Sequence, residues 1–158
     1  MGRIPWSDRP VLEKCRSITI KWLKANGYFK GIVNGSLRWA TADGQDMGAV
    51  SLRVVTLPSS DEHDVRLSYT LTKTSTGVKE SFEYSAPLVW SPCHFGGRRW
   101  WFTCPMKKIG STCRKRVGAL YLFGNQFGCR KCHNLTYLSS RNHNPLTSYY
   151  NKIFKHDV

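Results

Sequence analysis

The sequence has no long apolar run and no apolar segment at its start. None of its 158 residues belong to a stretch approaching the ~20 apolar residues that a transmembrane helix needs. The N-terminus lacks the apolar region of a secretory signal, and Trp6 stands where an N-myristoylation motif requires Ser or Thr. From these absences we expect a protein of the cytoplasm that is not attached to a membrane.

Acidic residues are scarce in one half of the chain only. Residues 1–90 contain 12 Lys and Arg against 9 Asp and Glu, whereas residues 91–158 contain 12 against the single acid Asp157. Such a positive field attracts polyanions and speeds their encounter. The imbalance favours DNA or RNA as a partner. The alternative is a solvated basic face that keeps a small protein soluble.

The period of the hydrophobic residues predicts a mainly β protein. Apolar and polar residues alternate between residues 36 and 90, most regularly at Val65, Leu67 and Tyr69, and turn signals separate the runs. Strands of this kind form an antiparallel meander with one face on a core. Residues 88–90 are expected to form one more short strand.

Helices are expected at both ends, so the predicted fold class is α+β. In the first thirty residues, Ser17 is placed to cap a helix in which Ile18 and Trp22 share a face. This segment favours a helix that covers one end of the sheet over the recognition helix of a helix-turn-helix. Near the C-terminus, Asn144 and Pro145 suit the start of a short amphipathic helix. Its apolar face, which would dock on its own domain or bind a protein partner, comprises Tyr149, Tyr150, Ile153 and Phe154.

Five of the six cysteines fall within a stretch of forty residues. In a reducing cytoplasm, clustered cysteines bind metal more often than they form disulfides. Cys129 and Cys132 have the Cys-x2-Cys spacing of a zinc knuckle, whereas eight residues separate Cys104 from Cys113. We expect those eight residues to bulge outward as a polar loop, because doubling a loop's length adds only ~0.6 kcal/mol of closure cost. The four cysteines are therefore predicted to bind a structural Zn²⁺ in a zinc ribbon.

Other nearby residues could replace one of these ligands. Cys93, His94 and His133 are the alternatives, although His133 adjoins Cys132 and two consecutive residues rarely bind the same ion. Otherwise Cys93 and Cys15 are expected to be small buried side chains. Four thiolates leave no open position for a substrate, and no acid stands near to act as a base, so we expect no catalysis.

Basic residues surround the predicted metal and alternate with aromatic ones such as Trp100, Trp101, Tyr121 and Phe127. Cations suit phosphates and aromatic faces suit bases, although most of these aromatic residues are expected to pack in the core. The predicted contacts to nucleic acid or to another partner are Arg98, Arg99, Lys107, Lys108, Arg114, Lys115, Arg116, Arg130 and Lys131.

The cysteine region resembles a family of uncharacterised bacterial proteins that are often found on phages and other mobile elements. Members share the pattern GG-x-R-W-W-F-x-C-P, C-x-R-R-V-x-x-L-Y and F-x-C-R-x-C-x-x-L-x-Y. Roughly residues 90–139 of this sequence match it closely, with Lys115 at the first Arg of C-x-R-R-V. A long first knuckle is normal among these proteins, so the resemblance supports the zinc assignment. A mobile-element origin would suit nucleic-acid binding or, alternatively, inhibition of a host defence complex such as a CRISPR effector.

These patterns divide the chain into three parts. Residues 1–90 are expected to form a module of a helix and antiparallel strands, residues 91–140 a basic zinc ribbon, and residues 141–158 an amphipathic helix or tail. Because no linker separates the parts, we expect them to pack continuously.

Overall fold

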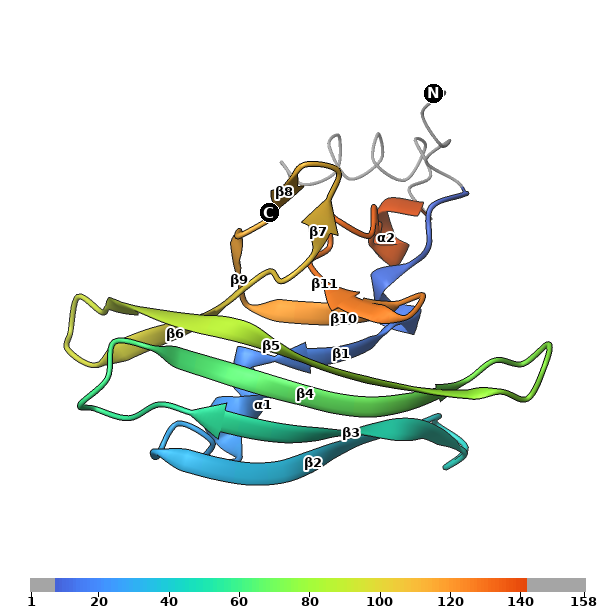
Figure 1. The fold of residues 1–158 in the computed structure, drawn as a ribbon. Coiled ribbons are helices and arrows are strands. Elements are labelled where there is room, and N and C mark those ends of the chain that lie inside the picture. The colour runs from blue at the N-terminus through green and yellow to red at the C-terminus, as the bar shows by residue number, and fades with distance from the viewer. Residues whose placement is uncertain (1–7, 142–158) are drawn as a thin grey trace, which may run out of the picture.

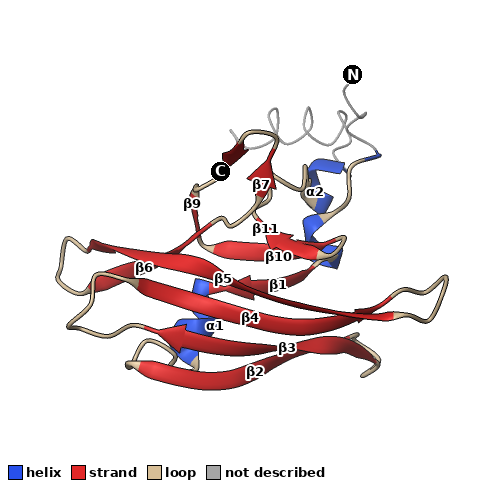
Figure 2. Cartoon of the chain, viewed as in Figure 1, coloured by secondary structure: helices blue, strands red, loops and turns tan. Residues whose placement is uncertain are grey.

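The computed structural model describes residues 8–141. The predicted partner-binding face of the C-terminal helix, Tyr149, Tyr150, Ile153 and Phe154, lies outside these residues. The described chain is mainly β with antiparallel sheets, as predicted, and has two short α-helices (Figures 1 and 2). The helix predicted from Asn144 lies outside the described residues.

The larger sheet has six antiparallel strands in the order β2-β3-β4-β5-β6-β9, so its first five strands form a meander. Polar and apolar residues alternate along these strands, so the apolar residues of each strand lie on the face of the sheet that is turned toward the core. The strands are β2 (Ile32–Ala40), β3 (Asp46–Val55), β4 (His63–Thr72), β5 (Lys79–Pro92), β6 (Arg98–Thr103) and β9 (Arg116–Val117).

A smaller sheet lies over one face of the larger one (Figure 1). It has the order β1-β10-β11, and a two-stranded ribbon, β7-β8, extends beyond it. These strands are β1 (Arg16–Thr19), β10 (Ala119–Phe123), β11 (Gln126–Gly128), β7 (Lys107–Lys108) and β8 (Ser111–Thr112). The helices are α1 (Ile20–Ala25) and α2 (Leu138–Arg141), and a single 3₁₀ turn precedes β1 at Leu12–Lys14.

One hydrophobic cluster fills the space between the two sheets. The larger sheet contributes its inner row, including the fully buried Val65 and Leu67, while α1 contributes Leu23. The smaller sheet contributes Ile18 and Phe127, which are also fully buried. Because strands from residues 16–19 and 119–128 share this core with the meander, burial fixes the cysteine region against the larger sheet.

The helical prediction for the first thirty residues is wrong before residue 20. Ser17 and Ile18 lie in β1, where Ile18 pairs with Leu120 of β10. The helix is capped by Thr19, whose Oγ1 accepts a hydrogen bond from the Trp22 N–H at 3.1 Å. Ser17 is therefore not the cap. Residues 16–19 form a strand and not a helix because they pair with β10, and the local sequence pattern does not reveal this partner.

Residues 88–90 do not form a separate strand, because they continue β5 without a break. Pro87 lies within this strand opposite Asp64 of β4. The neighbour on the other side, β6, begins to pair only at Leu88. The missing N–H of Pro87 therefore falls where that side of β5 has no partner strand, and the strand passes through the proline.

Candidate metal centre

The first pair of cysteines is carried by one interrupted β-hairpin. The β6-β9 and β7-β8 ladders have the same register, as if they were two parts of a single ladder. Between them, the Cys104 N–H donates to the Lys115 carbonyl and the Cys113 N–H donates to the Met106 carbonyl, each at 2.9 Å. The residues between the cysteines, predicted to be a bulging loop, are instead the end of this hairpin. The pairing explains how an eight-residue separation still places both thiols together.

The second knuckle is a helical turn that ends in a left-handed residue. The Leu135 N–H donates to the Arg130 carbonyl at 3.0 Å, and the Asn134 N–H donates to the Lys131 carbonyl at 3.3 Å. These two bonds form a Schellman motif, and Asn134, at φ 52°, occupies its left-handed position. Asn adopts this conformation more readily than most residues with a side chain. This compact turn, which begins directly after Cys129 and contains Cys132, brings the sulfur atoms of these two cysteines within 4.8 Å of each other.

The two knuckles meet so that four thiols surround a common centre. The sulfur atoms of Cys104, Cys113, Cys129 and Cys132 all lie within 4.8 Å of one another. The Cys104–Cys132 and Cys113–Cys129 sulfur separations are 3.9 and 4.0 Å. A tetrahedral ion with bonds of ~2.3 Å would need sulfur atoms about 3.8 Å apart. The four cysteines could therefore hold a metal ion with little movement.

Burial makes two of these thiols hard to ionise without a cation. Burial raises the pKa of Cys104 to about 11, although the N–H groups of Met106 and Cys129 act in the opposite direction. Burial also raises the pKa of Cys132, and the neighbouring thiols add to this effect. At Cys113 burial again acts to raise the pKa, but the Lys115 N–H and the other thiols lower it below its ordinary value. A bound cation would supply the charge that these thiolates need, and binding would release protons.

Two tyrosines of the larger sheet hold the hairpin that leads into the second knuckle. The Tyr84 hydroxyl of β5 accepts a hydrogen bond from the Phe127 N–H at 2.6 Å, and the Tyr69 hydroxyl of β4 donates to the Asn125 carbonyl at 2.7 Å. The two hydroxyl oxygens lie 3.2 Å apart. The strands predicted between residues 36 and 90 include both tyrosines, but the alternation does not predict this role. Period-two alternation identifies the face on which a side chain lies and not the loop that it contacts.

The alternative ligands do not join the four thiols. Cys93 and His94 lie exposed in the turn between β5 and β6, so the expectation that Cys93 is buried is wrong. His133 packs its ring against Phe123, with centroids 5.7 Å apart. Its Nε2 is buried and has no hydrogen-bond partner within the described residues. Cys15 is half-buried, and its thiol donates to the Val11 carbonyl at 3.5 Å.

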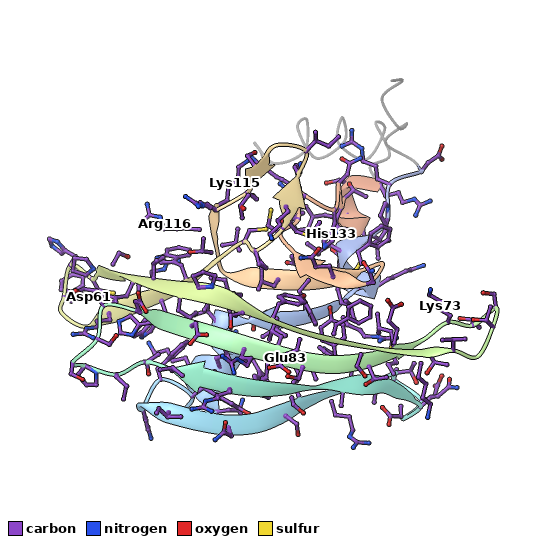
Figure 3. The ribbon with its side chains drawn as sticks, viewed as in Figure 1. Asp61, Lys73, Glu83, Lys115, Arg116 and His133 are labelled. Atoms are coloured by element: carbon purple, nitrogen blue, oxygen red, sulfur yellow. The ribbon has the colours of Figure 1, made fainter. Side chains whose placement is uncertain are left out.

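The nine predicted contact residues fall into two groups. Seven lie within a few positions of a cysteine, and we call them the knuckle cluster: Lys107, Lys108, Arg114, Lys115, Arg116, Arg130 and Lys131. Figure 3 shows Lys115 and Arg116 projecting outward beside the hairpin. Arg98 and Arg99 lie apart from them, at the start of β6. Within residues 8–141, none of the nine forms an ion pair.

The aromatic residues near the site are mostly covered, as expected. Trp100 is buried and stacks on Phe29, with ring centroids 5.2 Å apart. Phe127 is fully buried. The half-buried ring of Trp101 is covered by the Arg99 guanidinium at 4.4 Å. Trp90, which sequence reasoning did not select, is covered in the same way by Arg98, also at 4.4 Å.

No protein-family model, curated protein or solved structure matches this chain. In the part of the chain that the structure describes, no helix is both long enough and apolar enough to cross a membrane. What the protein does must therefore be inferred from the geometry and charge of its own residues.

Proposed function

We propose that this is a non-catalytic zinc protein that binds DNA or RNA through the knuckle cluster. The observation that carries the proposal is the convergence of four thiols at tetrahedral spacing, with seven basic residues next to them in sequence that form no ion pair in the described chain. The metal would hold the two basic turns at a fixed separation.

Zinc is the metal that fits these ligands best. Four thiolates in a tetrahedral arrangement are typical of structural Zn²⁺ sites in proteins of the cytoplasm, where thiols stay reduced. In the described residues, the ligand group contains neither histidine nor carboxylate. Four protein ligands complete the coordination of a tetrahedral ion, so no position remains for a substrate or an activated water. This chemistry supports a structural role for the metal.

The charge near the metal supports a polyanionic partner. Zn²⁺ with four thiolates contributes a charge of about −2, so the seven cations of the knuckle cluster leave about +5. Phosphates bound by such cations release counterions from nucleic acid, which makes affinity depend steeply on salt. Because the metal would fix both turns before binding, less conformational entropy would be lost when phosphates engage them.

The test combines metal analysis with binding measurements. Elemental analysis of the purified protein is expected to find one zinc per chain. Fluorescence anisotropy with labelled 20-nucleotide DNA and RNA, single-stranded and duplex, is expected to show affinity that falls steeply with rising salt. Each phosphate contact to duplex DNA should add about −0.9 to the slope of log affinity against log salt.

Two matched variants separate a specific role for the knuckle cluster from a general charge effect. K107A/K108A removes two cations of the cluster. K73A/K79A removes two cations from the β4-β5 hairpin, and Figure 3 shows Lys73 at the far end of the larger sheet from Lys115 and Arg116. The first variant should weaken binding clearly more than the second. Absent or salt-insensitive binding would refute the proposal, and a stoichiometric protein partner that survives nuclease treatment would favour the inhibitor alternative.

A further inference from the structure

A second group of basic residues lines a cleft between α1 and the start of β6, and Gly118, which follows β9, also lines it. The cleft has a volume of about 440 Å³. Its lining includes four cations from two separate segments, Lys21 and Lys24 of α1 with Arg98 and Arg99 of β6. Among the described residues that line it, none is acidic. Lys21 and Lys24 were not selected by sequence reasoning.

The four cations converge because of how their elements pack. Lys21 and Lys24 are three positions apart on α1 and therefore share one side of the helix. The buried Leu23 holds the helix on the core, which keeps this side next to β6. No ion pair involves any of the four side chains across residues 8–141, so their charges are not neutralised by the described protein.

The two arginines are held in place before any ligand binds. The Arg98 guanidinium lies 4.4 Å from the centre of the Trp90 ring, and that of Arg99 lies 4.4 Å from the centre of the Trp101 ring. A guanidinium stacked on an aromatic ring keeps its N–H edge free to bind a phosphate. Because stacking already restricts each side chain, binding would cost less rotamer entropy.

An exposed aromatic residue lies close in sequence to the cleft-lining Cys93. Phe95 is 98% exposed, at the tip of the turn that connects β5 to β6. The turn is closed by hydrogen bonds from the Cys93 N–H to the Gly97 carbonyl and from the Gly96 N–H to the Cys93 carbonyl, both at 3.1 Å. Cys93 itself lines the cleft, so Phe95 lies only two residues from its edge. Arginines stack on the rings of Trp90 and Trp101, whereas the Phe95 ring contacts only the edge of the neighbouring His94 ring, with centroids 4.9 Å apart, among the ring contacts of the described residues.

We propose that this cleft binds single-stranded nucleic acid, with Lys21, Lys24, Arg98 and Arg99 on consecutive phosphates and Phe95 stacked on a base. The inference rests on the proposed function and deepens it by naming the form of nucleic acid. Single strands are bound by cations along the backbone together with aromatic rings on which bases stack. A base in a duplex is already stacked between its neighbours, so an open phenylalanine ring adds little to duplex affinity.

The test uses the full-length, zinc-loaded protein and fluorescence anisotropy. The probes are labelled dT12 and rU12 and, for comparison, a labelled 12-base-pair DNA duplex. F95A should weaken single-strand binding by about fivefold or more, which is the lower end of the range for loss of one stacked base. The same variant should leave duplex binding unchanged. Because Phe95 is almost fully exposed, this change should not affect folding.

Charge removal in the cleft provides an independent test. K21A/K24A should weaken dT12 and rU12 binding and reduce the salt slope by about 1.4, which corresponds to two lost phosphate contacts on a single strand. K73A/K79A removes the same charge elsewhere and should have little effect. If K107A/K108A weakens binding while F95A and K21A/K24A do not, the proposed function stands and the cleft is refuted. If the native protein binds none of the probes, both proposals fail.

Discussion

Replacing Tyr84 by phenylalanine should loosen the cysteine region from the larger sheet without changing the shape of the core. The substitution removes one hydroxyl oxygen and leaves the ring in place. That oxygen is the acceptor for the Phe127 N–H at 2.6 Å and lies 3.2 Å from the Tyr69 hydroxyl. Phe127 is fully buried, so water has little access to replace the lost acceptor.

The expected cost follows from these two contacts. A buried N–H that loses its acceptor costs about 1–3 kcal/mol, and the loss of a second ordinary hydrogen bond costs about 0.5–1.5 kcal/mol. We therefore expect Tyr84→Phe to reduce the free energy of unfolding by about 1.5–4.5 kcal/mol. For a chain of this size, that change lowers Tm by about 3–18 °C.

Tyr69→Phe is the matched control, because it also removes one hydroxyl from the same network. The acceptor left unpaired is the Asn125 carbonyl, which belongs to an exposed turn. Water can satisfy this carbonyl, and the Tyr84 hydroxyl also loses its contact with Tyr69, so the two lost hydrogen bonds together cost about 1–3 kcal/mol. Urea and thermal unfolding of the zinc-loaded proteins, followed by circular dichroism, would measure both. If Tyr84→Phe costs no more than Tyr69→Phe, the Phe127 N–H does not depend on Tyr84 and the reasoning is refuted.

Further predictions concern the metal, the knuckles and pH. If the four cysteines hold zinc as proposed, a chelator should open the two knuckles to hydrogen exchange while the β signal in circular dichroism persists, because the hydrophobic cluster contains none of the cysteines. Complete unfolding would contradict this. In Gly128→Ala the added Cβ would lie 2.8 Å from His133 Nε2 and closer still to the Met106 side chain. This variant should therefore reduce the free energy of unfolding by about 1–3 kcal/mol and weaken zinc binding in a competition assay. Asn134→Gly should leave urea stability unchanged or raise it, whereas Asn134→Val should lower it by about 1–2 kcal/mol, since Asn134 has φ 52°. Burial raises the pKa of Tyr84 in the folded state, so above about pH 10 the tyrosine of the unfolded chain loses its proton first. The free energy of unfolding should therefore fall as the pH rises above about 10. In urea titrations at about pH 9–11, Tyr84→Phe should make this fall shallower.

Strands could be predicted from the sequence where neighbouring residues alone determine the pattern. The alternation at Val65, Leu67 and Tyr69 predicts β4, whose inner row is buried as expected. Alternation fails at β1, because Ile18 and its neighbours become a strand only through pairing with β10, about a hundred residues later. It also fails to show that β5 is continuous, because whether a proline ends a strand depends on which side of the strand is paired.

At the candidate site, residue identity could be predicted but spatial arrangement could not. The spacing of Cys129 and Cys132 and the excess of cysteines pointed to four thiols, which the structure brings together. The hairpin between Cys104 and Cys113 was not foreseen, because its short strands are only two residues each and carry no alternation. The basic cleft was missed because Lys21 of α1 meets Arg99 of β6 only after both elements pack on the core.

The unbroken register through the first cysteine pair also bears on how such sites are recognised in other chains. Each additional pair of residues at the end of this hairpin would extend both arms equally and leave the backbone bonds of Cys104 and Cys113 unchanged. The number of residues between the two thiols is then free to vary in steps of two, and the hairpin end could accept an inserted peptide. Sequence searches that require a short, fixed interval between metal-binding cysteines would pass over proteins built in this way, whereas searches for paired strands on either side of the cysteines would find them.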